Sequence, residues 1–174
     1  MGSGNLGMVW FPRLSGRVPL EEILSRWPDL VAGLASRPTI GVVVVDTYDR
    51  GPIAIGGEGV HIQNDGRVEG DDPLRQYGPR AREDLLRAAG LPNAGDLLLV
   101  SSVDSGGQVH AFEQQVGSHG GIGGMQNEAV LLYPVGLELD EDLVNVVGGR
   151  RMLVGAEAVN EQLLQWMRTL GLHP

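Results

Sequence analysis

Four consecutive valines at positions 42–45 constrain the fold of this chain more than any other feature of its sequence. They lie within the run 39–46, and β-branched side chains of this kind favour an extended strand. A strand with one exposed face alternates apolar and polar residues, whereas an unbroken apolar run is typical of a strand buried on both faces. A helical pattern precedes the run, so we expect a sheet of the α/β class with helices on both sides.

Two further runs predict buried strands of the same sheet, at 96–101 and at 128–133. The glycine-rich stretch 51–68 contains short apolar pieces and the hairpin dipeptide Asp65-Gly66, and it predicts a small antiparallel meander. Shorter strands are expected at 6–11 and 108–113, and helices at 19–27, 29–36, 80–89 and 155–170. We therefore predict an α/β fold, a partial three-layer sheet with a small antiparallel β meander, and a single domain over residues 1–174.

The composition excludes several classes of protein. The chain has no cysteine, which removes disulfides, cysteine-ligated metals and thiol nucleophiles. All thirteen basic residues are arginine, against 22 acidic ones, for a net charge of −9. No basic cluster is present, so we expect no nucleic-acid partner. No apolar stretch approaches the roughly 20 residues of a membrane span, and the first residues do not resemble a signal peptide. These features predict a soluble chain.

One of the four histidines stands out as a candidate for chemistry. His61 and His110 lie in strand-like patterns, where packing or surface positions are expected, and His173 is the penultimate residue. His119 lies in a loop with four glycines after it, where the backbone can approach a ligand closely. An exposed histidine in a glycine-rich turn is the alternative interpretation.

No complete active site can be assembled from the sequence. A metal centre needs three or four converging ligands, and the candidate carboxylates are scattered: Asp46, Asp49, Asp96, Asp104, Glu113 and Glu128. The glycine-rich segments do not match a P-loop or a dinucleotide-binding fingerprint, and no Gly-x-Ser-x-Gly nucleophile motif occurs.

Several strings nevertheless resemble one protein family over nearly the whole chain. They are Gly-Ser-Gly-Asn-Leu-Gly at 2–7, Gly-Arg-Val-Glu-Gly-Asp-Asp-Pro-Leu at 66–74, Tyr-Gly-Pro at 77–79, Ala-Phe-Glu at 111–113, Gly-Ser-His-Gly-Gly at 117–121, Leu-Leu-Tyr-Pro at 131–134 and Gly-Ala-Glu-Ala-Val at 155–159. These strings are similar to bacterial alkaline-phosphatase-superfamily proteins of the type I phosphodiesterase/nucleotide pyrophosphatase kind. Such proteins are often described as phage-holin-family proteins, because a membrane region precedes the hydrolase domain.

The resemblance implies hydrolysis of phosphate esters by two metal ions, usually zinc, with a Thr or Ser nucleophile. Of the family's metal ligands only the late histidine of a His-Gly loop has a counterpart here, His119. The resembled segment lies downstream of the nucleophile and of the other ligands. The resemblance therefore predicts the C-terminal lobe of an alkaline-phosphatase-like fold, inactive alone, whose phosphate-ester substrate is bound with an N-terminal hydrolase lobe.

Two alternatives follow from this interpretation. The chain is either part of such a hydrolase, cytoplasmic or tethered to a membrane through a preceding region, or a non-catalytic binding or assembly domain derived from that fold. A truncated lobe would leave an apolar face that the other half would have covered, which predicts a dimer or higher oligomer, since large apolar patches seldom stay exposed on monomers.

Overall fold

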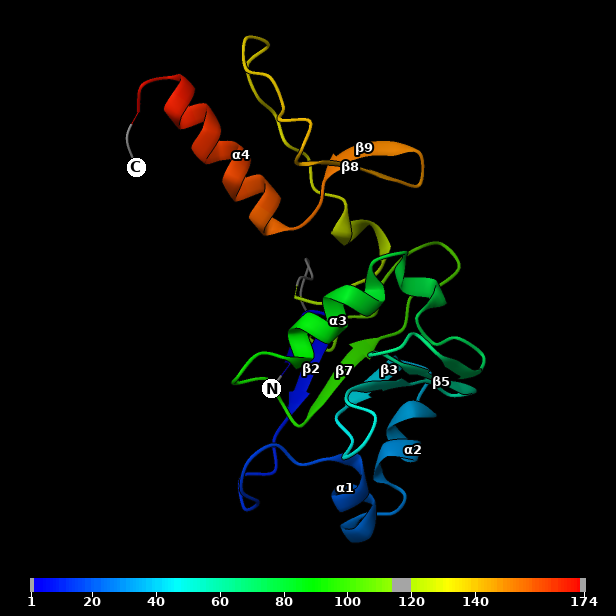
Figure 1. Cartoon of the computed structure of the whole chain (residues 1–174). Helices are drawn as coiled ribbons and strands as arrows, with labels where there is room; N and C mark the ends of the chain where they lie inside the picture. Colours follow the sequence, from blue (N-terminus) through cyan, green and yellow to red (C-terminus); the bar gives the residue numbers. More distant parts are fainter. Residues whose placement is uncertain (1, 114–119, 173–174) are drawn as a thin grey trace. The chain divides into compact units, whose positions relative to one another are not determined.

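The computed structural model describes residues 2–113 and 120–172. The chain divides into two compact units, Met1–Glu128 and Ala129–Pro174. The first unit is built on one sheet, and the second contains a β-hairpin and a long helix (Figure 1). Each unit is described by itself below.

The sheet of the first unit has seven strands, and every neighbouring pair is antiparallel. Its spatial order is β1-β2-β7-β3-β4-β5-β6. The strands are β1 (Gly2–Ser3), β2 (Leu6–Val9), β3 (Ile40–Val45), β4 (Ile53–Ile55), β5 (Gly59–Ile62), β6 (Val68–Gly70) and β7 (Leu97–Ser101). The predicted strands at 6–11, 39–46 and 96–101 are thus present, and the meander predicted at 51–68 is formed by β4, β5 and β6.

Strand β3 is the centre of this sheet, as its four valines predict. Val43 is paired with Leu99 of β7 on one side and with Ile55 of β4 on the other. The valines at 42–45 are 0–2% exposed. Val43 and Val45 face one core cluster and Val42 and Val44 face another, so both faces of the strand are buried.

Helices cover both faces. The helices α1 (Leu20–Arg26) and α2 (Leu30–Ala35) contribute Ile23 and Val31 to the cluster around Val43. The helix α3 (Ala81–Ala89) contributes Leu85 to the opposite cluster (Figure 1). Pro19 precedes the first turn of α1 and Pro28 lies between α1 and α2, which explains why this helical region is split into two short helices.

The predicted α/β class is wrong, because the sheet is wholly antiparallel and the fold is α+β. Neither a partial three-layer α/β sheet nor an alkaline-phosphatase-like one is present in the part of the chain that the structure describes. The unbroken valine run indicates only that both faces are covered. Helices over both faces of an antiparallel sheet produce the same sequence pattern as a parallel sheet, so strand direction cannot be obtained from it.

Two predicted strands are also wrong. The run 128–133 forms no strand, and Val130 and Leu132 are 82% and 89% exposed. The described residues of the run 108–113 form no strand either. Val109 of this run forms an isolated bridge with Val103. The apolar run 128–133 has no neighbouring strand, and a β-strand needs a neighbour for its backbone hydrogen bonds.

Asp96, a candidate carboxylate in the sequence, has a structural role. It is buried at the start of β7 and accepts hydrogen bonds from the backbone N–H groups of Phe11 (2.7 Å) and Val18 (2.9 Å). Hydrogen bonds to a carboxylate are stronger than neutral ones. Asp96 therefore fixes the loop that joins β2 to α1.

The second unit packs the helix α4 (Ala156–Thr169) against the chain segment that begins the unit. The Trp166 indole donates to the carbonyl of Glu138 (2.7 Å), and its ring lies 4.8 Å from that of Tyr133. The backbone N–H of Asp140 donates to the buried Gln162 side chain (2.8 Å). The unit also contains a hairpin that no sequence pattern predicted, formed by β8 (Val144–Val147) and β9 (Arg150–Leu153) around the Gly148-Gly149 turn.

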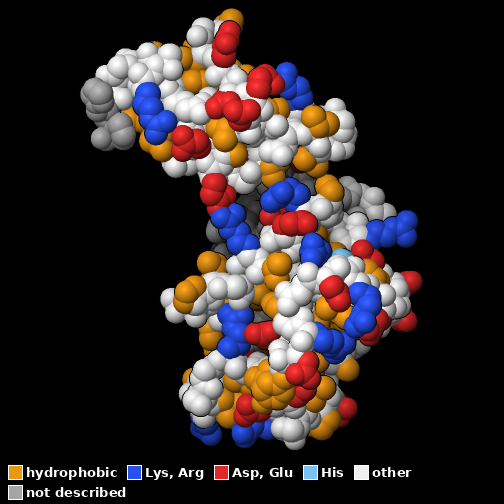
Figure 2. All heavy atoms as spheres, in the orientation of Figure 1, with side chains coloured by type: hydrophobic (Ala, Val, Ile, Leu, Met, Phe, Trp, Pro, Cys, Tyr) orange, Lys and Arg blue, Asp and Glu red, His pale blue; other side chains and the backbone are white. Residues whose placement is uncertain are grey.

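The surface is mixed in character. On the face drawn in Figure 2, arginine and acidic side chains are interspersed with hydrophobic ones. Within residues 2–113 and 120–172, no helix is long and apolar enough to cross a membrane.

Candidate functional site

His119, the predicted metal ligand, lies outside the described residues. The residues on either side of 114–119 are described, and both are attached to the same point of the sheet. The backbone N–H of Phe112 donates to the carbonyl of Gly4 at 2.7 Å. The carbonyl of Ile122 accepts from the Asn5 side chain at 3.0 Å. Two neighbouring residues between β1 and β2 therefore hold both flanks of the predicted site.

Asn5 is completely buried and is built into the sheet. Its carbonyl accepts the N–H of Ser101 at the end of β7 (3.0 Å), while its side-chain Nδ2 reaches Ile122. Gly121 lies so close that a Cβ on it would collide with the Asn5 amide. Only glycine allows the backbone to approach Asn5 in this way.

Tyr77 supports the same region from the α3 side of the sheet. It is 3% exposed, and its hydroxyl donates to the carbonyl of Ser101 at 2.7 Å. Burial raises the pKa of this hydroxyl, so it stays a donor well above neutral pH. Gly123 has a positive φ of 99°, and a Cβ on it would lie 2.7 Å from the Tyr77 ring. We call Gly4, Asn5 and Tyr77 the loop clamp.

The loop clamp joins strings that are far apart in the sequence. Gly4 and Asn5 belong to the Gly-Ser-Gly-Asn string, Tyr77 to Tyr-Gly-Pro, and Gly121 to Gly-Ser-His-Gly-Gly. All of them meet at the ends of β2 and β7. Three of the seven strings that carry the family resemblance thus contribute to this part of the fold.

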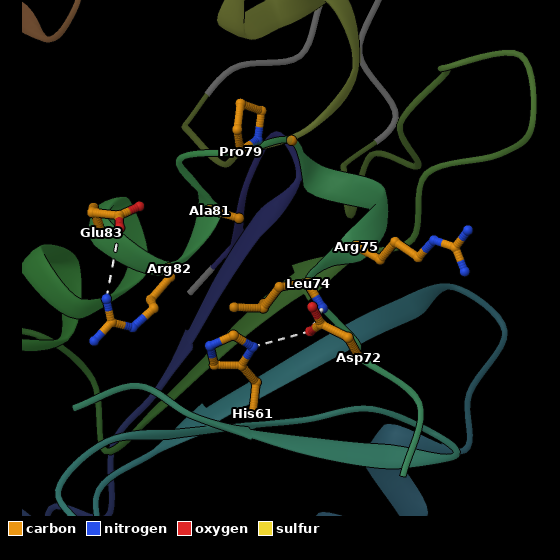
Figure 3. A pocket seen from close by; sticks show the side chains of 9 residues that line it. His61, Asp72, Leu74, Arg75, Pro79, Ala81, Arg82 and Glu83 are labelled. Carbon is orange, nitrogen blue, oxygen red and sulfur yellow. Dashed lines mark hydrogen bonds and ion pairs between the residues drawn. The ribbon is translucent and has the colours of Figure 1, made fainter. Parts of the chain in front are cut away.

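A second group of polar residues surrounds a pocket of about 490 Å³ beside α3 (Figure 3). His61, on β5, is 8% exposed, and its Nδ1 lies 3.0 Å from Oδ1 of Asp72. The same carboxylate oxygen accepts the backbone N–H of Leu74 at 2.9 Å. Nε2 of His61 is buried and has no hydrogen-bond partner. Asp72 thus orients the imidazole and leaves its second nitrogen unpaired in the protein interior.

The sequence pattern placed His61 among packing or surface residues and gave no sign of a pairing with Asp72. The register explains the pairing, because His61 is opposite Ala54 and Val68 and lies on the face that α3 covers. The Asp-Asp-Pro turn after β6 then brings Asp72 back over β5. Because side chains alternate between the two faces of a strand, the sequence 59–62 could have predicted that His61 lies on the face covered by α3. Its contact with Asp72 could not be predicted, because it depends on the Asp-Asp-Pro turn.

The other sequence candidates do not form a metal centre. Asp104 accepts the backbone N–H groups of Gly106 and Gln108 and closes a turn, and Asp46 accepts that of Thr47. His110 is exposed, and His173 lies outside the described residues. No group of three or more His, Asp or Glu residues that could hold a metal is found among residues 2–113 and 120–172. The described residues therefore do not fit a complete two-metal site.

Comparison with known proteins finds no matching family model, no similar curated protein and no similar solved structure.

Proposed function

We propose that this chain is the C-terminal part of a metal-dependent phosphate-ester hydrolase, of the phosphodiesterase or nucleotide pyrophosphatase kind. Its contribution is His119, which supplies one ligand to a metal site completed by an N-terminal lobe. The observation that carries the proposal is the attachment of Phe112 and Ile122 to Gly4 and Asn5. A loop whose two flanks are fixed on a sheet is held in the manner of binding and catalytic loops on rigid scaffolds.

Among residues 2–113 and 120–172, no group of three or more His, Asp or Glu residues could hold a metal ion. One imidazole among water molecules binds zinc too weakly to order a centre or activate a bound water. This chain alone is therefore expected to hydrolyse phosphodiesters no faster than its His119→Ala variant, even with added zinc or manganese.

The alternative function, a non-catalytic binding or assembly domain, is favoured by a different observation. Three side chains of the second unit are almost fully exposed although they are apolar: Val130, Leu132 and Val135. Exposed apolar residues in a group mark interaction sites.

The test is the activity of the protein purified from its own cells, together with any chain that accompanies it. With bis-p-nitrophenyl phosphate and zinc or manganese, we expect turnover that decreases by at least about a hundredfold in His119→Ala, because loss of a metal ligand removes charge stabilisation. His110→Ala is the control, since His110 is exposed. Metal-independent turnover, or turnover unchanged in His119→Ala, would contradict the proposal. No turnover at all would favour the assembly domain.

A further inference from the structure

The pocket beside α3 contains a buried histidine that packing does not explain. The carboxylate of Asp72 binds Nδ1 of His61, and Nε2 is left without a partner in the protein interior. A buried polar atom that is unpaired destabilises the folded state. Such an atom in a native structure points to a missing ligand or to a functional role.

The first turn of α3 faces the same pocket. Gly78, Pro79, Ala81, Arg82 and Glu83 all line it. In α3 the N–H of Asp84 is the first to bond one turn back, to the carbonyl of Arg80 (3.0 Å). The N–H groups of Arg82 and Glu83 precede it and have no acceptor in the described part of the chain. Free N–H groups and the helix dipole together favour an anion at such a terminus.

We propose that this pocket binds an oxyanion of the phosphate class, held by the first turn of α3 and by the protonated imidazole of His61. Figure 3 shows the ring between Asp72 and Arg82, with Nδ1 toward Asp72 and the other nitrogen on the Arg82 side. With a proton on Nε2, the ring donates to Asp72 on one side and to the oxyanion on the other. The proposal is independent of the hydrolase function and of His119.

The charged side chains around the pocket are of both signs. Asp72 and Glu83 are acidic, whereas Arg75 and Arg82 are basic. Arg82 is already engaged, since its Nε donates to the carbonyl of Gln63 (2.6 Å) and its guanidinium to that of Asn64 (2.9 Å). Arg75 points away from His61 in Figure 3. The two acidic and two arginine side chains that line the pocket therefore sum to zero charge.

Glu83 opposes the anion and provides a test by gain of affinity. Its carboxylate lies 3.7 Å from Arg82 at the helix start, with the side chain 48% exposed. Replacing it by glutamine removes a negative charge at the pocket without removing the two carbonyl bonds of Arg82. Glu83→Gln should therefore bind phosphate more tightly than the wild type.

The experiment is an NMR titration of the whole chain with inorganic phosphate, at matched ionic strength with chloride as reference. We expect saturable shifts at the amides of Arg82 and Glu83 and at the His61 ring. His61→Gln should weaken binding by about tenfold, the loss of a charge-assisted hydrogen bond. Glu83→Gln should strengthen it by about threefold.

His110→Gln is the matched control, and it should leave the affinity unchanged because His110 is exposed outside the pocket. Absence of saturable shifts at Arg82 and Glu83 would overturn the proposal. The proposal would also be overturned if a folded His61→Gln variant bound phosphate with the same affinity as the wild type, since His61 would then be a packing residue. If His61→Gln fails to fold, an affinity of Glu83→Gln no higher than that of the wild type would overturn it.

Discussion

Tyr77 lies where three segments of the first unit meet. Its hydroxyl donates to the carbonyl of Ser101, and its ring lies against Gly123. A Cβ at Gly41 would collide with the same hydroxyl. One buried phenol thus fixes the end of β7, the neighbouring part of β3 and the described flank of the glycine-rich loop.

Burial also gives Tyr77 an effect on stability at high pH. Burial raises the pKa of the hydroxyl in the folded protein, whereas the pKa of a tyrosine in the unfolded chain is about 10. The stabilisation is complete below about pH 10 and is lost as the pH rises further, by up to about 1.4 kcal/mol per pH unit. Urea unfolding between pH 8 and pH 11 should show this decrease in the wild type.

Tyr77→Phe should lower the free energy of unfolding at pH 8 by about 1–2 kcal/mol, because the Ser101 carbonyl loses its donor. It should also reduce the alkaline decrease. Tyr48→Phe is the control, since Tyr48 is 68% exposed. Equal alkaline decreases in the wild type and in Tyr77→Phe would show that Tyr77 does not carry the effect.

At the scale of elements, one physical property separates the successful strand predictions from the failed prediction at 128–133. The runs at 42–45 and 97–101 are apolar and have neighbouring strands on both sides in the sheet. The run at 129–133 is equally apolar but has no neighbour, and Leu132 is 89% exposed. The apolar composition of a run indicates that its side chains tend to be buried. Whether a partner strand lies beside the run depends on the rest of the fold.

This difference predicts opposite results for two leucine substitutions. Leu98→Ala, in β7, should lower the free energy of unfolding by about 2–4 kcal/mol because Leu98 is 1% exposed. Leu132→Ala should change it by less than about 0.5 kcal/mol, as surface substitutions usually do. Chemical denaturation of both variants measures this, and a destabilisation of comparable size would mean that Leu132 is buried in solution.

At the scale of the whole molecule, the sequence was sufficient for the helices and for most strands of the sheet but not for its class. The antiparallel order places β7 between β2 and β3, although β7 comes after both in the chain. No local pattern encodes such an insertion. The prediction for His119 rests on its glycine-rich surroundings and stays a prediction, because it lies outside the described residues. Asn5 and Tyr77 could not be predicted, because they act through contacts distant in the sequence.

The exposed apolar residues lead to a prediction about assembly. Val130, Leu132 and Val135 are 82%, 89% and 101% exposed, and we expect the purified chain to self-associate through them. Sedimentation equilibrium should give a dimer or larger species at high concentration. Leu132→Asp should shift the distribution to monomer, whereas Leu172→Asp, a substitution elsewhere in the second unit, should leave it unchanged. A wild type that stays monomeric would contradict the prediction.

The central proposal is that His119, whose flanking residues Phe112 and Ile122 are attached to Gly4 and Asn5, supplies a ligand to a shared metal site. The metal content of the protein purified from its own cells, with any accompanying chain, tests it most directly. We expect bound zinc or another divalent metal in the wild type, and a loss of at least about tenfold in metal affinity for His119→Ala, as for other ligand-shell losses. Asn5→Ala should weaken the site and leave some metal bound. Equal metal content in the wild type and His119→Ala, or no bound metal in the wild type, would contradict the claim.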